Sequence, residues 1–312
     1  MRPLARRLAV GALSAALALG AAEAAWRVRA GRFGPTTNPR YVVRDDELGW
    51  RYLPGARVRH RTQDFDVQVE IDARGLRDAS PAPAGSRPIA ALGDSLTFGW
   101  GVEEAQAFPA LLERLTGVPV ENLGVSGYGT DQELLFFRRA GAALAPRALV
   151  VTVCGNDVEE VARRSTYGRA KPWFRPGGPP LASEPPAAEG FFVRWSQLAR
   201  SLHKALAERA ARPLSPPEVD EARAEVVALL AELGRLAAEG QGGLLVCAAG
   251  EPWLAGPLSE RGIAFLDLGP ALERAGRAAP VTFAHDLHWT AQGHAAVAAA
   301  VAERLGELGL LD

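Results

Sequence analysis

A serine, a histidine and an aspartate are placed along the chain so that they could form a nucleophile with its base. Ser95 follows an apolar run and Gly93-Asp94, and near the chain end His288 comes two residues after Asp286. An imidazole can take the proton of a serine hydroxyl when a carboxylate holds its other ring nitrogen. Each piece alone is weak, because serine commonly caps helices. Together they predict catalytic chemistry by Ser95, His288 and Asp286.

Two further residues could stabilise the negative charge that such chemistry generates. Gly124 follows Asn122-Leu123, and Asn156 lies between Gly155 and Asp157. A single donor of this kind is worth roughly 3 to 4 kcal/mol in acyl-transfer enzymes. We therefore expect an oxyanion hole formed by the backbone amides of Ser95 and Gly124 and the side-chain amide of Asn156.

The spacing of apolar runs predicts the elements that position these residues. Four short apolar runs are separated by helical stretches, at residues 89–92, 148–153, 244–248 and 263–268. Such runs are typical of a parallel sheet that is covered by helices on both faces. We therefore expect a three-layer α/β/α domain over residues 86–312. Its candidate site residues would meet at the carboxyl ends of the strands, where ligands bind in open α/β sheets.

Three sequence blocks resemble those of SGNH hydrolases, also called GDSL esterases and lipases, over about residues 86–304. The blocks are Ile89 to Thr97, Asn122-Leu123-Gly124 running on to Gly127-Tyr128-Gly129, and Gly155-Asn156-Asp157. The resemblance implies a flavodoxin-like fold and hydrolysis of ester bonds without a cofactor. It also implies Ser95 as nucleophile, His288 as general base, and Gly124 and Asn156 as oxyanion donors.

A further block, around His288 near the chain end, departs from the family pattern. The family usually has an aspartate three residues before the catalytic histidine, whereas His285 stands there and Asp286 is two before His288. This Asp-x-His-Trp form is similar to one in acetyltransferase-like proteins that modify exopolysaccharides. A serine ester hydrolase is our first interpretation. An O-acetyltransferase or deacetylase acting on exported polysaccharide is the second, and a non-catalytic surface-binding protein on the same fold is the third.

The first 25 residues have the layout of an export signal. Arg2, Arg6 and Arg7 precede an uncharged run over residues 8–22, which is within the range of a signal-peptide apolar region. The small-x-small sequence Ala22-Glu23-Ala24 favours cleavage, whereas Trp26 and the arginines after it suit an uncleaved membrane anchor. Cleavage is our first interpretation and an anchor the second; both predict an extracytoplasmic protein, and residues 8–25 would provide the membrane association if the segment is retained. A cytosolic chain with an apolar start is the third alternative.

Two other segments are distinct from the predicted sheet domain. Residues 26–85 contain alternating apolar and polar positions, such as Val67, Val69 and Ile71, and predict a small N-terminal β extension. Residues 159–214 interrupt the strand-helix rhythm with aromatics among prolines. We expect them to form an insertion near the mouth of the site.

The charge balance and the motifs of the chain limit which partners and cofactors we expect. The 35 basic and 36 acidic residues give a net charge of -1, which does not favour nucleic acid. His285, His288 and His294 lack the spacing of a His-Glu-x-x-His metal motif, and no nucleotide-binding glycine motif occurs, so we predict no metal and no cofactor. The expected substrate is a small-molecule ester or an acylated glycan or lipid.

The sequence leaves open whether Cys154 and Cys247 are free or bonded.

Overall fold

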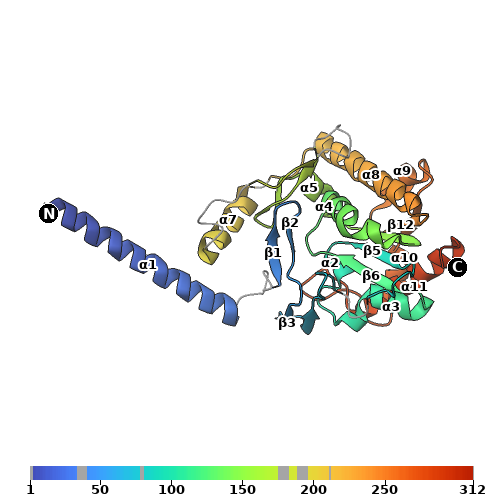
Figure 1. Cartoon of the computed structure of the whole chain (residues 1–312), viewed down its shortest axis with the longest axis horizontal. Helices are drawn as coiled ribbons and strands as arrows, with labels where there is room; N and C mark the ends of the chain where they lie inside the picture. Colours follow the sequence, from blue (N-terminus) through green and yellow to red (C-terminus); the bar gives the residue numbers. More distant parts are fainter. Residues whose placement is uncertain are drawn as a thin grey trace.

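The computed structural model describes residues 3–33, 41–77, 81–174, 183–187, 196–210 and 212–311. Its centre is a five-stranded, all-parallel sheet between two layers of helices (Figure 1). The spatial order of the strands is β13-β12-β7-β5-β6. Their bounds are β5 Ile89–Gly93, β6 Val120–Gly124, β7 Ala148–Val153, β12 Gly243–Ala248 and β13 Ala264–Asp267. This architecture confirms the predicted three-layer α/β/α class with a central parallel sheet.

The helices of the sheet domain alternate with these strands along the chain. They are α2 Ser95–Phe98, α3 Phe108–Thr116, α4 Thr130–Phe136, α5 Asp157–Val161, α8 Pro216–Glu239, α9 Ala255–Ser259, α10 Gly269–Gly276 and α11 Ala291–Glu307, with the short turns η1 Glu104–Gln106, η2 Phe137–Gly141, η3 Ala142–Leu144 and η4 Pro252–Leu254.

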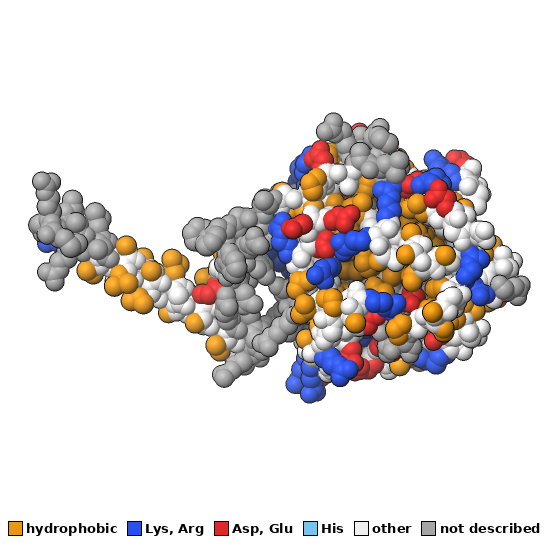
Figure 2. All heavy atoms as spheres, in the orientation of Figure 1, with side chains coloured by type: hydrophobic (Ala, Val, Ile, Leu, Met, Phe, Trp, Pro, Cys, Tyr) orange, Lys and Arg blue, Asp and Glu red, His pale blue; other side chains and the backbone are white. Residues whose placement is uncertain are grey.

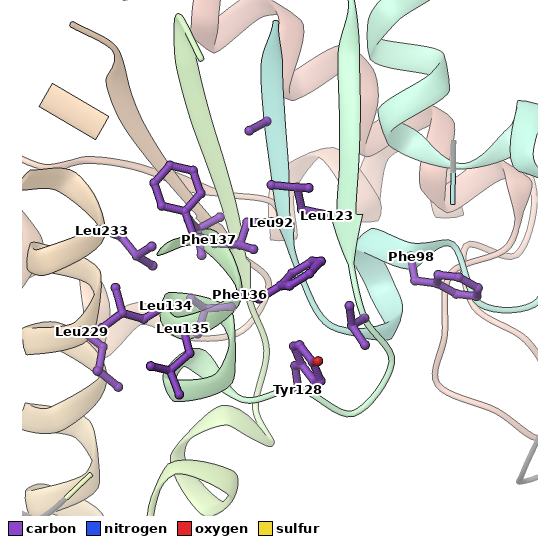
Figure 3. Packing of buried hydrophobic residues seen from close by; sticks show 14 of the residues in the cluster. Leu92, Phe98, Leu123, Tyr128, Leu134, Leu135, Phe136, Phe137, Leu229 and Leu233 are labelled. Atoms are coloured by element: carbon purple, nitrogen blue, oxygen red, sulfur yellow. The ribbon is translucent and has the colours of Figure 1, made fainter. Parts of the chain in front are cut away.

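Helices cover both faces of the sheet, which explains why its strands are apolar at successive positions. Because side chains alternate across a strand, Leu92 of β5 belongs to the core cluster with α4 and α8. Its neighbour Ala91 belongs to the opposite cluster with α3 and α11. Figure 3 shows the first cluster: Leu92 and Leu123 of the sheet lie near Phe137 and the leucines of α4, and Leu229 and Leu233 of α8 face them from the left of the view.

Strand β5 is the topological switch point of the sheet. The chain passes from β5 to β6 on one side and then to β7 on the other side, and ligands in such sheets bind beyond the carboxyl end at this point. Directly after β5, the Asp94 side chain accepts a hydrogen bond from the Leu96 N–H (2.9 Å) and caps α2. The fold therefore places Ser95, the first residue of α2, where a substrate is expected.

The predicted N-terminal β extension forms two antiparallel hairpins. They pair β1 (Val42–Asp45) with β2 (Gly49–Tyr52), and β3 (Arg57–Arg61) with β4 (Asp66–Glu70). Trp50 and Tyr52 of β2 are almost fully buried and join the core cluster of the sheet domain. The extension is therefore packed against the sheet domain and shares its core.

Residues of the expected insertion, 159–214, contain short hairpins and one longer helix, while 175–182, 188–195 and 211 lie outside the described residues. The hairpins pair β8 (Ser165–Thr166) with β9 (Arg169–Ala170), and β10 (Trp173–Phe174) with β11 (Ser183–Glu184). The helix is α7 (Gln197–Ala210).

The N-terminal helix α1 (Pro3–Phe33) extends away from the sheet domain (Figure 1). The C-terminal part of α1 contacts α7. Figure 2 shows apolar side chains along much of its exposed length. Val10, Leu13, Leu17 and Leu19 are each more than half exposed. Within the described residues, no helix has the length and apolar character that crossing a membrane requires.

Candidate active site

The structure brings the three predicted catalytic residues into direct contact. Ser95 Oγ lies 2.6 Å from Nε2 of His288. On the other side of the ring, Oδ1 of Asp286 contacts His288 Nδ1 and also accepts the His288 backbone N–H at 3.0 Å. Burial raises the pKa of Asp286, but its hydrogen bonds with His288 outweigh this effect, so the net pKa lies below the ordinary value. A charged Asp286 can fix the ring tautomer that leaves Nε2 free to accept the serine proton.

The loop that carries His288 is held by a buried anchor next to it. Trp289 is almost fully buried and packs edge-on against Phe108 and His294. The His288 carbonyl accepts a hydrogen bond from the Phe283 N–H at 3.1 Å, so the loop folds back on itself. This packing explains the use of tryptophan directly after the base.

His285, which occupies the position where the family usually has aspartate, points elsewhere. Its Nδ1 lies 2.8 Å from Oδ1 of Asp64, at the turn between β3 and β4. The carboxylate of the triad is thus supplied by Asp286, and His285 connects the catalytic loop to the N-terminal extension.

Asn156 lies beside the catalytic residues at the end of β7 and lines the same cavity. Its Oδ1 is 2.8 Å from the thiol sulfur of Cys154, and its side chain also hydrogen-bonds with Glu160. An amide group has two hydrogens, so one donor remains for a ligand. Burial and the nearby Asp94 charge raise the pKa of the Cys154 thiol well above its usual range. Both cysteines are free.

The loop carrying Asn156 is held in place by a buried carboxylate. Asp157 accepts hydrogen bonds from the N–H and hydroxyl of Thr130, at 2.9 and 2.7 Å, and from the Cys154 N–H at 2.9 Å. Burial and the Asp94 charge raise the pKa of Asp157 to about 7, although these hydrogen bonds oppose the shift. Asp157 therefore joins the end of β7 to the start of α4 and fixes Asn156 relative to the loop over residues 125–129.

The structure does not bring Gly124 to the cavity, which corrects our prediction for this residue. The Gly124 N–H donates to Oδ1 of Asn122 at 2.9 Å. A Cβ at Gly124 would lie only 2.2 Å from the backbone nitrogen of Phe98. Glycine is therefore required here so that α2 can pack against β6, and its amide is already used.

Gly127, three residues further along, does line the cavity. It has a φ of +80°, which favours glycine. Among the hydrogen bonds of the described residues, none uses the Gly127 N–H. The second glycine of the same sequence block, and not the first, thus has an amide that is available to a ligand. Its position in the loop beyond the strand was the signal that sequence reasoning passed over.

The cavity beside Ser95 has a volume of about 810 Å³, within the range of small-molecule sites. Sequence analysis missed the N-terminal residues that form part of its wall, Tyr41 and Trp50. The hydroxyl of Tyr52 donates to Ser126 Oγ at 2.9 Å and accepts the Ser126 N–H at 2.7 Å. The extension therefore fixes the residue next to Gly127. Aromatic residues at alternate positions of a short strand, Trp50 and Tyr52, were the available signal.

The insertion supplies another part of the wall, as expected from its composition. Tyr167, Arg169, Ser201 and Lys204 all line the cavity. Tyr167 is half exposed, and its hydroxyl donates to the buried carboxylate of Glu160 at 2.9 Å. The three candidate catalytic residues therefore lie on the sheet domain, while residues far away in sequence line the cavity beside them.

A possible nucleophile, base and orienting carboxylate thus meet at the carboxyl edge of a parallel α/β sheet. The family model described as "GDSL-like Lipase/Acylhydrolase family" matches residues 91–296, more than half of the chain. The chain belongs to this family and is an ester-bond hydrolase.

Several solved structures are similar to this chain. TesA shares 15% identity with a TM-score of 0.45, covering 71% of this chain and 99% of that one. A mutant of Axe2, an acetyl-xylooligosaccharide esterase from Geobacillus Stearmophilus, shares 14% with a TM-score of 0.41, covering 71% and 95%. The lipase/acylhydrolase from Enterococcus faecalis shares 15% with a TM-score of 0.41, covering 71% and 96%. No curated protein matches the chain.

Proposed function

We propose that this protein hydrolyses carboxylic esters through an acyl-enzyme formed on Ser95. The observation that carries the proposal is the continuous contact from Ser95 Oγ through the His288 ring to Asp286. This arrangement provides a nucleophile, a base and a group that orients the base.

In the first half of the reaction, His288 Nε2 takes the Ser95 proton as Oγ attacks the ester carbonyl. His288 then gives the proton to the departing alcohol, and the acyl group stays on Ser95. In the second half, His288 takes a proton from water, whose oxygen attacks the acyl carbon. The carboxylic acid leaves, and Ser95 recovers its proton. No external oxidant, reductant or cofactor is needed.

The negative charge on the carbonyl oxygen requires donors at the same edge of the sheet. We assign this role to the backbone amides of Ser95 and Gly127 and the side-chain amide of Asn156. The Ser95 amide belongs to the first residue of α2, and such amides lack partners within their helix. The free Gly127 N–H supports its place in this set.

A short-chain aryl ester series, from acetate to octanoate, tests the proposal with the full chain and with Ser95→Ala. We expect loss of at least about 10³-fold in kcat for Ser95→Ala, because the covalent route is removed. Ser201→Ala is a matched control, because it also removes a serine hydroxyl from the cavity lining and, within the described residues, Ser201 contacts none of those assigned to the chemistry. Equal turnover by the wild type and Ser95→Ala would overturn the assignment.

The same acyl-enzyme could be released by a sugar hydroxyl in place of water, which is the O-acetyltransferase alternative. The Asp286-x-His288-Trp289 order supports keeping this alternative. Aryl acetate turnover with and without added glycan separates the two. Acetylated glycan formed at the expense of free acetate would identify a transferase, and free acetate alone would identify a hydrolase.

We also propose that the protein acts outside the cytoplasm and keeps its N-terminal helix for membrane association. Glu23 of α1 accepts hydrogen bonds from Ser196 Oγ (2.8 Å) and the Leu198 N–H (3.0 Å) at the start of α7. Trp26 Nε1 donates to Ser201 Oγ at 3.1 Å, and Ser201 lines the cavity. Cleavage after Ala24 would remove Glu23 and leave the start of α7 without these bonds.

The intact mass of the exported protein tests this proposal, together with its partition between membrane and soluble fractions. We expect the uncleaved mass in the membrane fraction, since exposed apolar side chains along α1 favour a lipid interface. A chain that begins after Ala24 and stays in the soluble fraction would contradict retention.

A further inference from the structure

A second cavity of about 570 Å³ lies next to the first, at the same carboxyl edge of the sheet. Gly155, directly before Asn156, lines both cavities. The other walls come from α5, from the start of α8 with the residues before it, and from the loop after β12. A molecule that fills both cavities would therefore pass the expected oxyanion site.

Charged groups and an indole ring line this second cavity together. The Arg223 guanidinium lies 5.2 Å from the centre of the Trp253 ring. The Arg223 Nε is buried and has no hydrogen-bond partner among the described residues. Trp253 Nε1 donates to the Glu251 carboxylate at 2.5 Å, which fixes the indole. Glu159 supplies a second carboxylate to the lining.

These groups match one chemical class of ligand better than others. A guanidinium donates hydrogen bonds and carboxylates accept them, so hydroxyl groups that do both are suitable partners. The indole packs against the hydrophobic core and under the Arg223 guanidinium, and the part of the ring that lines the cavity is an apolar surface for the C–H groups of a sugar. An acyl chain would leave the buried Arg223 Nε without a polar partner, and an anionic sugar would face two carboxylates, Glu159 and Glu251.

We propose that the second cavity is a subsite for a neutral sugar residue of an O-acylated glycan. Resting on the proposed ester hydrolysis, this inference identifies the substrate class: the ester carbonyl lies at Ser95, and the neighbouring sugar occupies the cavity beside Arg223 and Trp253. Gly155 lines both cavities, and the Glu251 carboxylate lies beside it, where a Cβ at Gly155 would be 3.2 Å from the carboxylate oxygen.

The test compares kcat/KM for aryl acetate with that for singly O-acetylated mono-, di- and trisaccharides of glucose, xylose and mannose. We expect kcat/KM to rise at least about tenfold from mono- to trisaccharide in one neutral series, since contacts outside the reacting group lower the barrier. Arg223→Gln and Trp253→Ala should each remove most of this gain. An acetylated uronic-acid trisaccharide should show no such gain.

Arg277→Gln is a matched control, because Arg277 is exposed at the end of α10 and lies outside both cavity linings. It should keep the gain with chain length. Trp253→Phe keeps an aromatic ring and should retain more of the gain than Trp253→Ala, which separates ring contact from a folding defect.

The outcomes for the subsite and for the proposed function are distinct. Hydrolysis of aryl acetate with no gain in any sugar series would overturn the subsite and leave the serine hydrolase in place. If no ester is turned over, calorimetric titration of Ser95→Ala with the unacetylated trisaccharides still tests the subsite. Binding that Arg223→Gln weakens about tenfold would support it, and absence of binding to all three sugars would overturn it.

Discussion

The carboxyl edge of the sheet and the walls of the cavity are built in different ways. Ser95 lies two residues after β5, and Asn156 lies three residues after β7, so each is placed by the end of a buried strand. The walls come from hairpins before the sheet domain and from the insertion within it, through Trp50, Tyr167 and Ser201. The catalytic groups thus depend on local chain geometry, whereas the shape of the cavity depends on packing between distant segments.

We expect the two regions to control different properties of the enzyme. Groups at the sheet edge contact the reacting atoms, so their loss should reduce kcat. Wall residues contact the parts of the substrate that do not react, so their loss should change the preference among substrates. The two regions meet at Ser126, which Tyr52 of the extension holds next to Gly127.

The largest effect is expected from the sheet edge. Asn156→Ala should lower kcat about 10² to 10³-fold with little change in KM, because it removes a donor to the transition-state oxyanion. Steady-state kinetics on aryl acetate measures this, with the melting temperature as a control for folding. A variant whose kcat stays within about threefold of wild type would remove Asn156 from the oxyanion hole and weaken the distinction between edge and wall.

A smaller effect is expected from the wall. Tyr167→Ala should change the ratio of kcat/KM between octanoate and acetate esters by about tenfold, because it removes a ring that lines the cavity. Tyr167→Phe is the matched control: it keeps the ring and loses only the hydroxyl bond to Glu160. If both esters lose activity equally in Tyr167→Ala, the wall contributes to the chemistry itself, and the two regions cannot be separated in this way.

The sheet could be predicted closely because each buried parallel strand is a short apolar run. The expected runs 148–153 and 244–248 correspond to β7 (Ala148–Val153) and β12 (Gly243–Ala248). The contacts among Ser95, His288 and Asp286 also agree with the residues expected to react together. Gly124 and Gly127 could not be distinguished, because both are glycines in one sequence block. The structure separates them through α2, whose backbone packs against Gly124.

The amino-acid sequence by itself determined the layered fold and the residues that could react, because strand apolarity, helix spacing and the order of motifs are local properties. Only the tertiary structure decided which amide is free and which segments enclose the cavity. Those features depend on contacts between residues far apart in the chain, such as Tyr52 with Ser126 and Glu23 with the start of α7. Hydrophobic patterning records that a residue is buried, and it does not specify the partner against which the residue packs.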